Sequence, residues 1–342
     1  MAAGIEDVAR AAGVSTATVS RALRGLPNVS AGTRDRVRTV AAELGYVASP
    51  SAASLASGRT HTIGLISPSI NRWFFANVIE GAERTLRAQG FDVLLYTFDT
   101  PENHRARVDP DVLRRRVDGI LVVGLPLAAD EVAALIRLGR PLVCIGWGGH
   151  GQVTVRLDDR ATAITATNHL IALGHRRIAH LTGAPDDVAP SSPPVERAGG
   201  WRDALIAAGI DVDPALERHG QFTVEGGRAA MRELIAAVPD LTAVFAASDE
   251  MAMGAMLALR EAGLSVPEDV SVIGVDGHDL GELVGLTTIA QPANEQGATA
   301  ARIVLGMIGG LVPPQEIVMP TQFVERTSTA PPRVPASRPS AR

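Results

Sequence analysis

The feature that most constrains the fold is the alternation of short apolar runs with helical runs between residues 61 and 330. The apolar runs have the length of strands and fall at 63–67, 92–96, 119–123, 142–145, 177–181, 243–246 and 271–275. Helical runs separate them, at about 75–89, 130–138, 161–173, 197–208, 225–237, 250–262 and 292–309. Continuously apolar strands joined by helices predict parallel sheets covered on both faces. About 270 residues exceed one doubly wound domain, so we expect two α/β lobes, each a doubly wound parallel sheet.

Residues 1–47 predict a separate all-α domain of three short helices. In the first helix, apolar residues recur at i, i+3, i+4 and i+7 from Ile5, and Gly13 suits the left-handed turn that ends a helix. Ser15 and Ser30 suit the N-caps of the second and third helices, and Gly45 closes the third. The tight turn between the first two helices favours a helix-turn-helix over a plain helical bundle with a solvated face.

The second of these helices has a slim polar face. Its apolar residues face inward, which leaves outside Thr16, Ala17, Ser20, Arg21 and Arg24. Small residues let a helix backbone enter the major groove, and an arginine can bond both N7 and O6 of guanine. Residues 1–60 carry seven arginines against four acidic residues, although the whole chain has a net charge of −5. A basic N-terminal segment on an otherwise acidic chain predicts that this segment binds a polyanion.

Two segments differ in composition from the rest of the chain. Residues 48–60 are small, polar and nearly uncharged, and they predict a linker with one or two helical turns at 50–57. Residues 331–342 are rich in Pro, Ser and Arg, and we expect this tail to be disordered. The expected organisation is therefore a helical domain suited to DNA at 1–47, a linker at 48–60 and a two-lobed α/β domain at 61–330.

Composition and missing motifs exclude several functional classes. No apolar stretch is long enough to span a membrane, and the acidic start of the chain is unlike a signal peptide. The single cysteine, Cys144, cannot form an internal disulfide, which fits the cytoplasm. The eight histidines form no metal-ligand pattern, and the sequence has no nucleotide-binding or nucleophile motif. We therefore expect a cytoplasmic protein without metal, cofactor or enzymatic activity.

The run from Asp7 to Arg21 (DVARAAGVSTATVSR) resembles the LacI/GalR family of bacterial transcriptional repressors. Further motifs similar to that family follow in order at 28–30, 44–46, 118–120, 174–179, 197–201, 248–249, 266–274, 286–288 and 326–329. The resemblance extends over residues 4–330. It implies that residues 1–47 are a helix-turn-helix DNA-binding headpiece and that 48–60 form a hinge. It also implies that 61–330 are an effector-binding and dimerisation domain with two lobes of the periplasmic-binding-protein type. We place the N-lobe at about 61–160 and 290–319, and the C-lobe at about 161–289 and 320–330.

The resemblance implies DNA contacts for eight residues, seven in the headpiece and one in the hinge. Three match positions that contact base edges: Thr16, Ala17 and Arg21. Four match positions on or near phosphates: Ser15, Ser20, Asn28 and Ser30. For Ser15 and Ser30 the alternative is helix capping alone, although both roles are compatible.

Leu55 matches the hinge leucine that wedges into the minor groove at the operator centre. The alternative for Leu55 is an ordinary packing leucine. Ala48, Ser49 and Ala53 replace the Pro, Asn and Arg of the usual hinge. The hinge thus lacks a cation near phosphate, and we expect it to bind DNA less tightly.

The resemblance also implies an effector between the lobes, at the carboxyl ends of the strands. The positions that match the family's cleft are Trp73, Phe74, Phe75, Asp158, Arg197, Phe222, Ser248 and Asp276, with Trp147 as a further candidate. An arginine and an aspartate suit a polyol, because each can bridge two vicinal hydroxyls, so we expect a sugar or sugar derivative. The alternatives are core packing for the aromatic residues and a structural salt bridge for the charged pair. Trp73, Ser248 and Gly277 replace the Pro, Asn and second Asp that are usual in the family.

These observations predict a sequence-specific transcriptional regulator, most simply a repressor. It would bind palindromic operator double-stranded DNA as a homodimer under allosteric control by the effector. The expected dimer surface lies around residues 78–88, and four prolines without a leucine in the tail exclude a tetramerising heptad helix. A solute-binding protein without DNA function is the alternative, and a cleft enzyme is a third reading. The sequence leaves open the effector, the operator and the choice between induction and co-repression.

Overall fold

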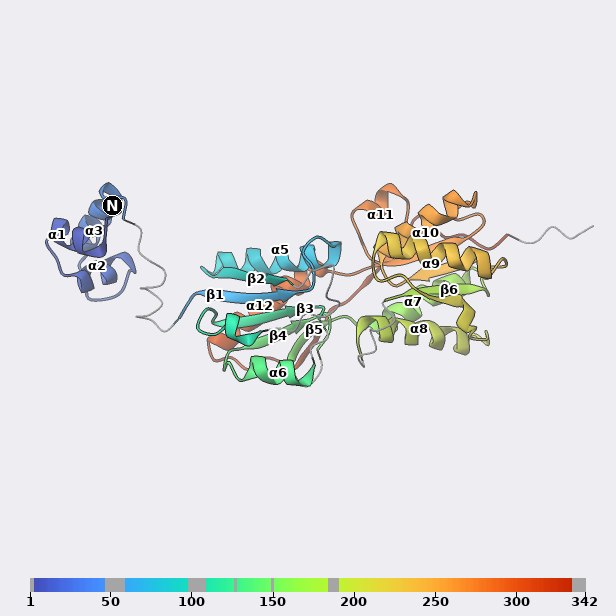
Figure 1. Cartoon of the computed structure of the whole chain (residues 1–342), viewed down its shortest axis with the longest axis horizontal. Coiled ribbons are helices and arrows are strands. Elements are labelled where there is room, and N and C mark those ends of the chain that lie inside the picture. Colours follow the sequence, from blue (N-terminus) through green and yellow to red (C-terminus); the bar gives the residue numbers. More distant parts are fainter. Residues whose placement is uncertain are drawn as a thin grey trace, which may run out of the picture.

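The computed structural model describes residues 3–46, 59–97, 109–125, 128–148, 151–183 and 191–333. It contains a three-helix headpiece and two α/β lobes (Figure 1). The predicted hinge residues Ala48, Ser49, Ala53 and Leu55 lie outside the described residues, as does most of the predicted tail. No helix within the described ranges is both long and apolar enough to cross a membrane.

The headpiece consists of α1 (Ile5–Ala12), α2 (Thr16–Leu23) and α3 (Ala31–Glu43). Its core is made by the inward faces of the three helices, at Val8, Ala9, Ala12, Val19, Ala22, Val37 and Ala41. Gly13 has a φ of +65°, which lets the chain turn sharply between α1 and α2. The three helices and the tight turn confirm the predicted helix-turn-helix.

The first lobe is built on a six-stranded sheet in the order β11-β5-β4-β3-β1-β2. All of its strand pairs are parallel, and the strands are β1 (Thr62–Ser67), β2 (Asp92–Thr97), β3 (Gly119–Val123), β4 (Leu142–Ile145), β5 (Val153–Arg156) and β11 (Glu316–Val318). The accompanying helices are α5 (Trp73–Ala88), the 3-10 turn η1 (Pro110–Val112), α6 (Ala129–Ile136) and α12 (Ala293–Ile308). Helices α5 and α12 pack on the core of this sheet.

The second lobe has a six-stranded sheet in the order β12-β10-β9-β8-β6-β7. Its strands are β6 (Ile178–Thr182), β7 (Glu217–His219), β8 (Ala243–Ala246), β9 (Ser271–Asp276), β10 (Thr287–Ala290) and β12 (Gln322–Val324). Its helices are α7 (Asp159–Ala172), α8 (Pro193–Ala207), the turn η2 (Pro214–Leu216), α9 (Val224–Ala237), α10 (Asp249–Glu261) and α11 (Leu280–Leu283). The edge strand β12 pairs antiparallel with β10, so this sheet is mostly rather than wholly parallel.

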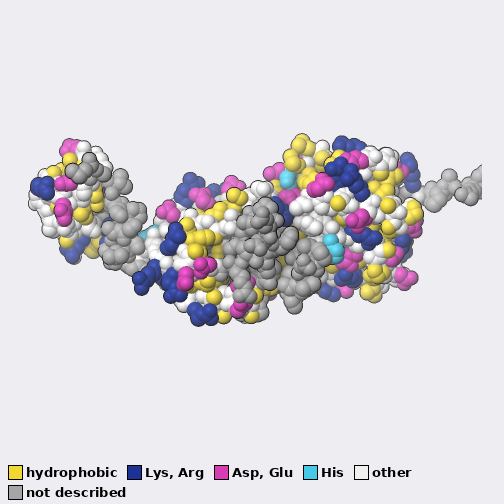
Figure 2. All heavy atoms as spheres, in the orientation of Figure 1, with side chains coloured by type: hydrophobic (Ala, Val, Ile, Leu, Met, Phe, Trp, Pro, Cys, Tyr) yellow, Lys and Arg dark blue, Asp and Glu magenta, His cyan; other side chains and the backbone are white. Residues whose placement is uncertain are grey.

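The chain crosses between the lobes three times within the described residues, after β5, after β10 and between β11 and β12. All three crossings leave from the carboxyl ends of strands that pair parallel with a neighbour, two in the first sheet and one in the second. The carboxyl edges of the two sheets are therefore turned toward the junction of the lobes, where a ligand of such a fold is expected. Figure 2 shows acidic and basic side chains mixed over the visible face of the lobes. A mixed face of this kind gives no net attraction for a polyanion.

Candidate nucleic-acid interface and ligand cleft

The outer face of α2 is free for a partner. Val19 and Ala22 are fully buried in the headpiece core, whereas Thr16, Ala17 and Arg21 are exposed. Helix α2 is only two turns long. Packing of its inner face in the core therefore also determines where its outer face points. Arg21 lies in the last turn of the helix, at the end of a strip of small residues. This arrangement suits a helix that enters the major groove.

The two predicted caps are present in the structure. The Ser15 hydroxyl accepts a hydrogen bond from the Thr18 amide at 3.2 Å, and the Ser30 hydroxyl accepts one from the Thr33 amide at the same distance. Asn28 has a φ of +69°, a left-handed conformation that asparagine tolerates better than most residues. All three side chains are exposed at the starts of helices or in a turn, so their predicted phosphate contacts stay predictions.

A buried ion pair lies in the second lobe at the junction. Arg197 of α8 donates from Nε to Asp159 Oδ1 at 2.8 Å, and both side chains are only 6% exposed. A second guanidinium nitrogen of Arg197 donates to the Ala247 carbonyl oxygen. Arg197 is thus held in place by its own lobe and presents a fixed cation near the ends of the strands.

The structure assigns different roles to the two neighbouring aspartates. The Asp158 side chain is exposed and caps α7 by accepting from the Ala161 amide at 2.9 Å. Asp159 is the buried one and binds Arg197. The capping role of Asp158 is observed, and the ligand role predicted for it stays a prediction. Asp159 is a site residue that the sequence analysis missed.

Asp276 is the last residue of β9 and combines burial with backbone strain. Its φ of +140° is unusual for any residue other than glycine. Its Oδ1 accepts from Gln291 Nε2 at 2.6 Å. Burial, and then the nearby charge of Asp249, raise the pKa of Asp276 to about 7, although the charge of Arg197 acts in the opposite direction. A strained, buried carboxyl at a strand end is typical of a binding site.

Asp276→Asn is expected to stabilise the protein at pH 8 but not at pH 4. The folded protein holds a proton on Asp276 up to a pKa of about 7, whereas the ordinary value is 3.8. The wild type therefore loses stability as the pH rises through this interval, and asparagine does not titrate. Urea unfolding at both pH values measures the difference. The exposed neighbour Asp279→Asn is the control, and the same pH dependence in both variants would contradict the assignment.

Asp249 and Ser248 form the start of α10 beside Asp276. Asp249 is buried and accepts hydrogen bonds from the amides of Gly277 and His278 at 2.9 and 2.8 Å and from the Thr288 hydroxyl at 2.7 Å. The Ser248 hydroxyl accepts from the Met251 amide at 3.2 Å. Asp249 therefore fixes the loop that follows Asp276, and Ser248 serves as the N-cap of α10.

The three adjacent aromatic residues Trp73, Phe74 and Phe75 begin α5. The two phenylalanines lie against the first lobe, whereas Trp73 contacts the second. Phe74 and Phe75 meet edge to face, with ring centroids 5.4 Å apart. A Cβ on Gly124, just after β3, would lie 2.7 Å from Phe75, and one on Gly146, just after β4, would lie 3.4 Å from Phe74. Both phenylalanines thus cover the carboxyl ends of two strands and are half-buried. The alternative of core packing therefore holds for part of each ring.

Trp73 is turned toward the second lobe. Its ring stacks on His278, with centroids 5.6 Å apart and planes 26° apart. This stacking brings Trp73 and Asp276 to the same junction, because His278 follows Asp276 by two residues.

The other two predicted aromatic residues lie elsewhere along the chain. Phe222 has a φ of +55° and packs, half-buried, on the core of the second lobe just before α9. Trp147 is 7% exposed.

A chain of buried amides extends from Asp276 into the first lobe. Gln296 of α12 donates to Gln291 Oε1 at 2.9 Å, and Gln291 donates to Asp276. Gln296 is fully buried. The sequence analysis missed both glutamines, since glutamine is ordinarily a surface residue and neither is part of a distinctive motif.

Two histidines of the second lobe, His175 and His180, have structural contacts. His180 is fully buried between Trp201 and Phe245, and burial lowers its pKa to about 3. His175 forms hydrogen bonds with Thr242, Ser271 and Ala330, and these connect the segment at Ala330 to the start of β9. Among the residues that the structure describes, no group of three or more His, Cys, Asp or Glu side chains could hold a metal ion.

Comparisons with known proteins agree with this architecture. Residues 4–49 match the family described as bacterial regulatory proteins, lacI family, and residues 167–329 match the periplasmic binding protein-like domain. The transcriptional regulator CelR of Thermobifida fusca is 37% identical over 95% of this chain and 97% of its own length. The transcriptional repressor CytR of Escherichia coli K12 is 37% identical over 90% of this chain and 91% of its own.

Solved structures give the same result. A CelR–cellobiose complex covers 95% of this chain and 99% of its own, at 35% identity and a TM-score of 0.71. A lac repressor dimer bound to operator and the anti-inducer ONPF covers 96% and 100%, at 27% identity and a TM-score of 0.84. Fold and relatives together define a DNA-binding transcriptional regulator, not an enzyme. The chain belongs to the LacI family.

Proposed function

We propose that this regulator is a repressor that binds a palindromic operator as a homodimer and responds to a sugar held between its lobes. The observation that carries the proposal is that one chain combines two features. Helix α2 has an exposed face of small residues with Arg21 at its end, and the two-lobed domain has the strained, buried carboxyl of Asp276 at its junction. A protein that must meet chromosomal DNA works in the cytoplasm.

Selection of genomic fragments by the purified full-length protein tests this function. We expect enrichment of a sequence with dyad symmetry, because each headpiece of a dimer reads one half-site. The selection is run with and without a sugar-rich cell extract, so that a requirement for a co-repressor becomes visible. Absence of an enriched palindrome under both conditions would overturn the proposal.

The proposed DNA contacts combine base reading and phosphate binding. They are Ser15, Thr16, Ala17, Ser20, Arg21, Asn28 and Ser30, with Leu55 in the hinge. Exposure of the α2 face supports the base-reading residues, and the positions of Ser15 and Ser30 at helix starts support phosphate contacts.

Arg21→Ala is expected to weaken binding to the selected operator about 5- to 150-fold, because one bidentate contact to guanine contributes about 1–3 kcal/mol of discrimination. Binding to unrelated DNA should change little, so the ratio of the two affinities falls. Arg10→Ala is the matched control, since Arg10 is also exposed but lies on α1 and pairs with Asp7. Titration of labelled DNA measures both variants, and equal losses would contradict the base-reading role.

The proposed effector site combines the aromatic residues of α5 with the polar groups of the second lobe. It comprises Trp73, Phe74, Phe75, Asp158, Arg197, Phe222, Ser248 and Asp276. A fixed guanidinium and a carboxyl suit the hydroxyls of a sugar, and half-buried rings suit its apolar face. The similarity to CelR, solved with cellobiose, makes cellobiose the first sugar to test against the operator complex.

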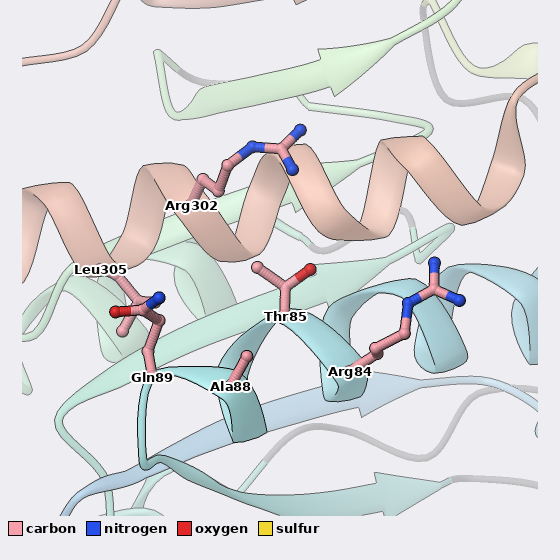
Figure 3. Close-up of a pocket in the computed structure, with 6 residues that line it drawn as sticks. All are labelled: Arg84, Thr85, Ala88, Gln89, Arg302 and Leu305. Atoms are coloured by element: carbon pink, nitrogen blue, oxygen red, sulfur yellow. The ribbon is translucent and has the colours of Figure 1, made fainter.

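The proposed dimer surface is the outer face of α5 and α12. A groove of about 510 Å³ runs between these two helices of one lobe (Figure 3). Its walls are Arg84, Thr85, Ala88 and Gln89 of α5 with Arg302 and Leu305 of α12. The groove overlaps the surface predicted around residues 78–88 and is separate from the cleft. A sedimentation experiment that gives a tetramer at micromolar concentration would contradict a dimer.

A further inference from the structure

Glu250 joins the two lobes at the proposed effector cleft. It is the second residue of α10 in the second lobe. Its carboxylate accepts from Arg72 Nε at 3.2 Å and from the Trp73 amide at 3.1 Å. Arg72 and Trp73 begin α5 in the first lobe. The side chains of Arg72 and Glu250 are only 28% and 16% exposed, so water screens their attraction less than at an open surface.

The electrostatic surroundings of Glu250 favour this contact. Arg72 is the N-cap of α5 and makes no side-chain cap bond, so the Trp73 amide would otherwise be one of the unpaired donors of that helix start. Glu250 also lies in the first turn of its own helix. The carboxylate thus lies near the positive ends of two helix dipoles, one from each lobe, and beside a guanidinium.

The contact also fixes the Trp73 indole. With its amide held by Glu250, the ring stacks on His278 of the other lobe. The indole Nε1 is buried and has no hydrogen-bond partner among the described residues. A buried donor without a partner is rare in proteins, and at a binding site it is available to an acceptor atom of a ligand.

The interior behind this contact is closed to solutes. Arg197, Ser248 and Asp276 are 5%, 4% and 6% exposed. A sugar can reach them only when the lobes separate, and separation breaks the bonds of Glu250. We propose that Glu250 is a positioning residue that latches the cleft and holds Trp73 ready to donate to the effector. The latch itself is a property of the free protein, and only its link to a sugar rests on the proposed function.

Acrylamide quenching of tryptophan fluorescence tests the latch. Glu250→Gln keeps the size of the side chain and removes its charge, so the lobes should open more often and Trp73 should become accessible. We expect a quenching constant at least about twofold larger than in the wild type. Trp201 and Trp147 are 0% and 7% exposed in this closed arrangement, and a variant without Trp73 separates its contribution from theirs. Trp73→Phe in the Glu250→Gln background should abolish the increase.

Glu225→Gln is the matched control. Glu225 is also the second residue of a helix in the second lobe, but its partner Arg228 belongs to the same helix. Equal quenching constants for the wild type and both glutamine variants would overturn the latch. Should Glu250→Gln lack the far-ultraviolet circular dichroism of the wild type, Arg72→Gln breaks the same bond from the other lobe and is judged by the same criterion.

Neither DNA nor sugar is present in the quenching assay, so its outcome is independent of the operator selection. A second step then links the latch to the effector. Trp73→Phe keeps an aromatic ring, although a smaller one, and removes the donor, so it should weaken release of the operator by cellobiose more than it weakens operator binding. If cellobiose releases the operator equally well from this variant, the donor role is wrong while the latch stands on the quenching result.

Discussion

Asp159→Ala is expected to lower the free energy of unfolding by about 3–5 kcal/mol, the usual cost of leaving one partner of a buried ion pair uncompensated. Arg197 would keep its bond to the Ala247 carbonyl but would lose its counter-charge at a site that is only about one-twentieth exposed. Urea unfolding at neutral pH measures the loss.

Asp158→Ala is the matched control for this experiment. The two residues are adjacent and have the same chemistry, but the Asp158 side chain is exposed and its hydrogen bond is a cap of α7. Loss of a cap costs about 0.5–2 kcal/mol. Equal losses in the two variants would mean that Arg197 does not need Asp159. The comparison also bears on function, because without Asp159 the guanidinium of Arg197 keeps only its bond to the Ala247 carbonyl and is positioned less firmly, so the operator complex should respond less to sugar.

The contrast between these two aspartates shows what the sequence could predict about the site. The sequence analysis names Asp158 as a candidate for the effector cleft, just before an expected helix, and does not single out Asp159. It cannot show that α8 packs on α7 and brings Arg197 onto Asp159. Arg197 and Asp276 were predicted from a family motif, and their ligand contacts stay predictions. Glu250 was missed, because its partners lie far away in the sequence and in the other lobe.

The fold was predicted where the signal is local. The headpiece carries its own caps, turn and apolar stripe within 47 residues, and the central strands are continuously apolar. The strands that were missed are β5, β7, β10, β11 and β12, each three or four residues long. Several of them lie at sheet edges or pair with distant segments, as β11 does with β5. So short a run has too little periodicity of its own, and the neighbouring strand determines its conformation.

Gly81→Ala is expected to destabilise the first lobe by about 3 kcal/mol, the upper end of the usual cost of overpacking. Helices α5 and α12 meet through two glycines. A Cβ on Gly81 would lie 1.9 Å from the backbone oxygen of Asn294, and one on Gly297 would lie 2.0 Å from that of Val78. Because both obstacles are backbone atoms, no change of rotamer relieves the clash, and the helices must move apart.

Gly32→Ala is the control and should have the opposite sign. Gly32 lies in α3, and an added Cβ would meet nothing within 4 Å. Alanine there should stabilise the headpiece by up to about 1 kcal/mol, because it restricts the unfolded chain more than glycine does. Scanning calorimetry of both variants measures the two effects. A stability for Gly81→Ala within 1 kcal/mol of the wild type would show that α5 and α12 tolerate separation.

The same substitution tests how the first lobe is connected to the effector site. Helix α12 carries Gln296, which reaches Asp276 through Gln291. A shift of α12 should therefore disturb the Asp276 carboxyl that we propose binds the sugar, although Asp276 and Gly81 belong to different lobes. The concentration of cellobiose that releases half of the operator should rise in Gly81→Ala and stay unchanged in Gly32→Ala. If it stays unchanged in both, the amide chain holds the lobes together but does not transmit the position of α12.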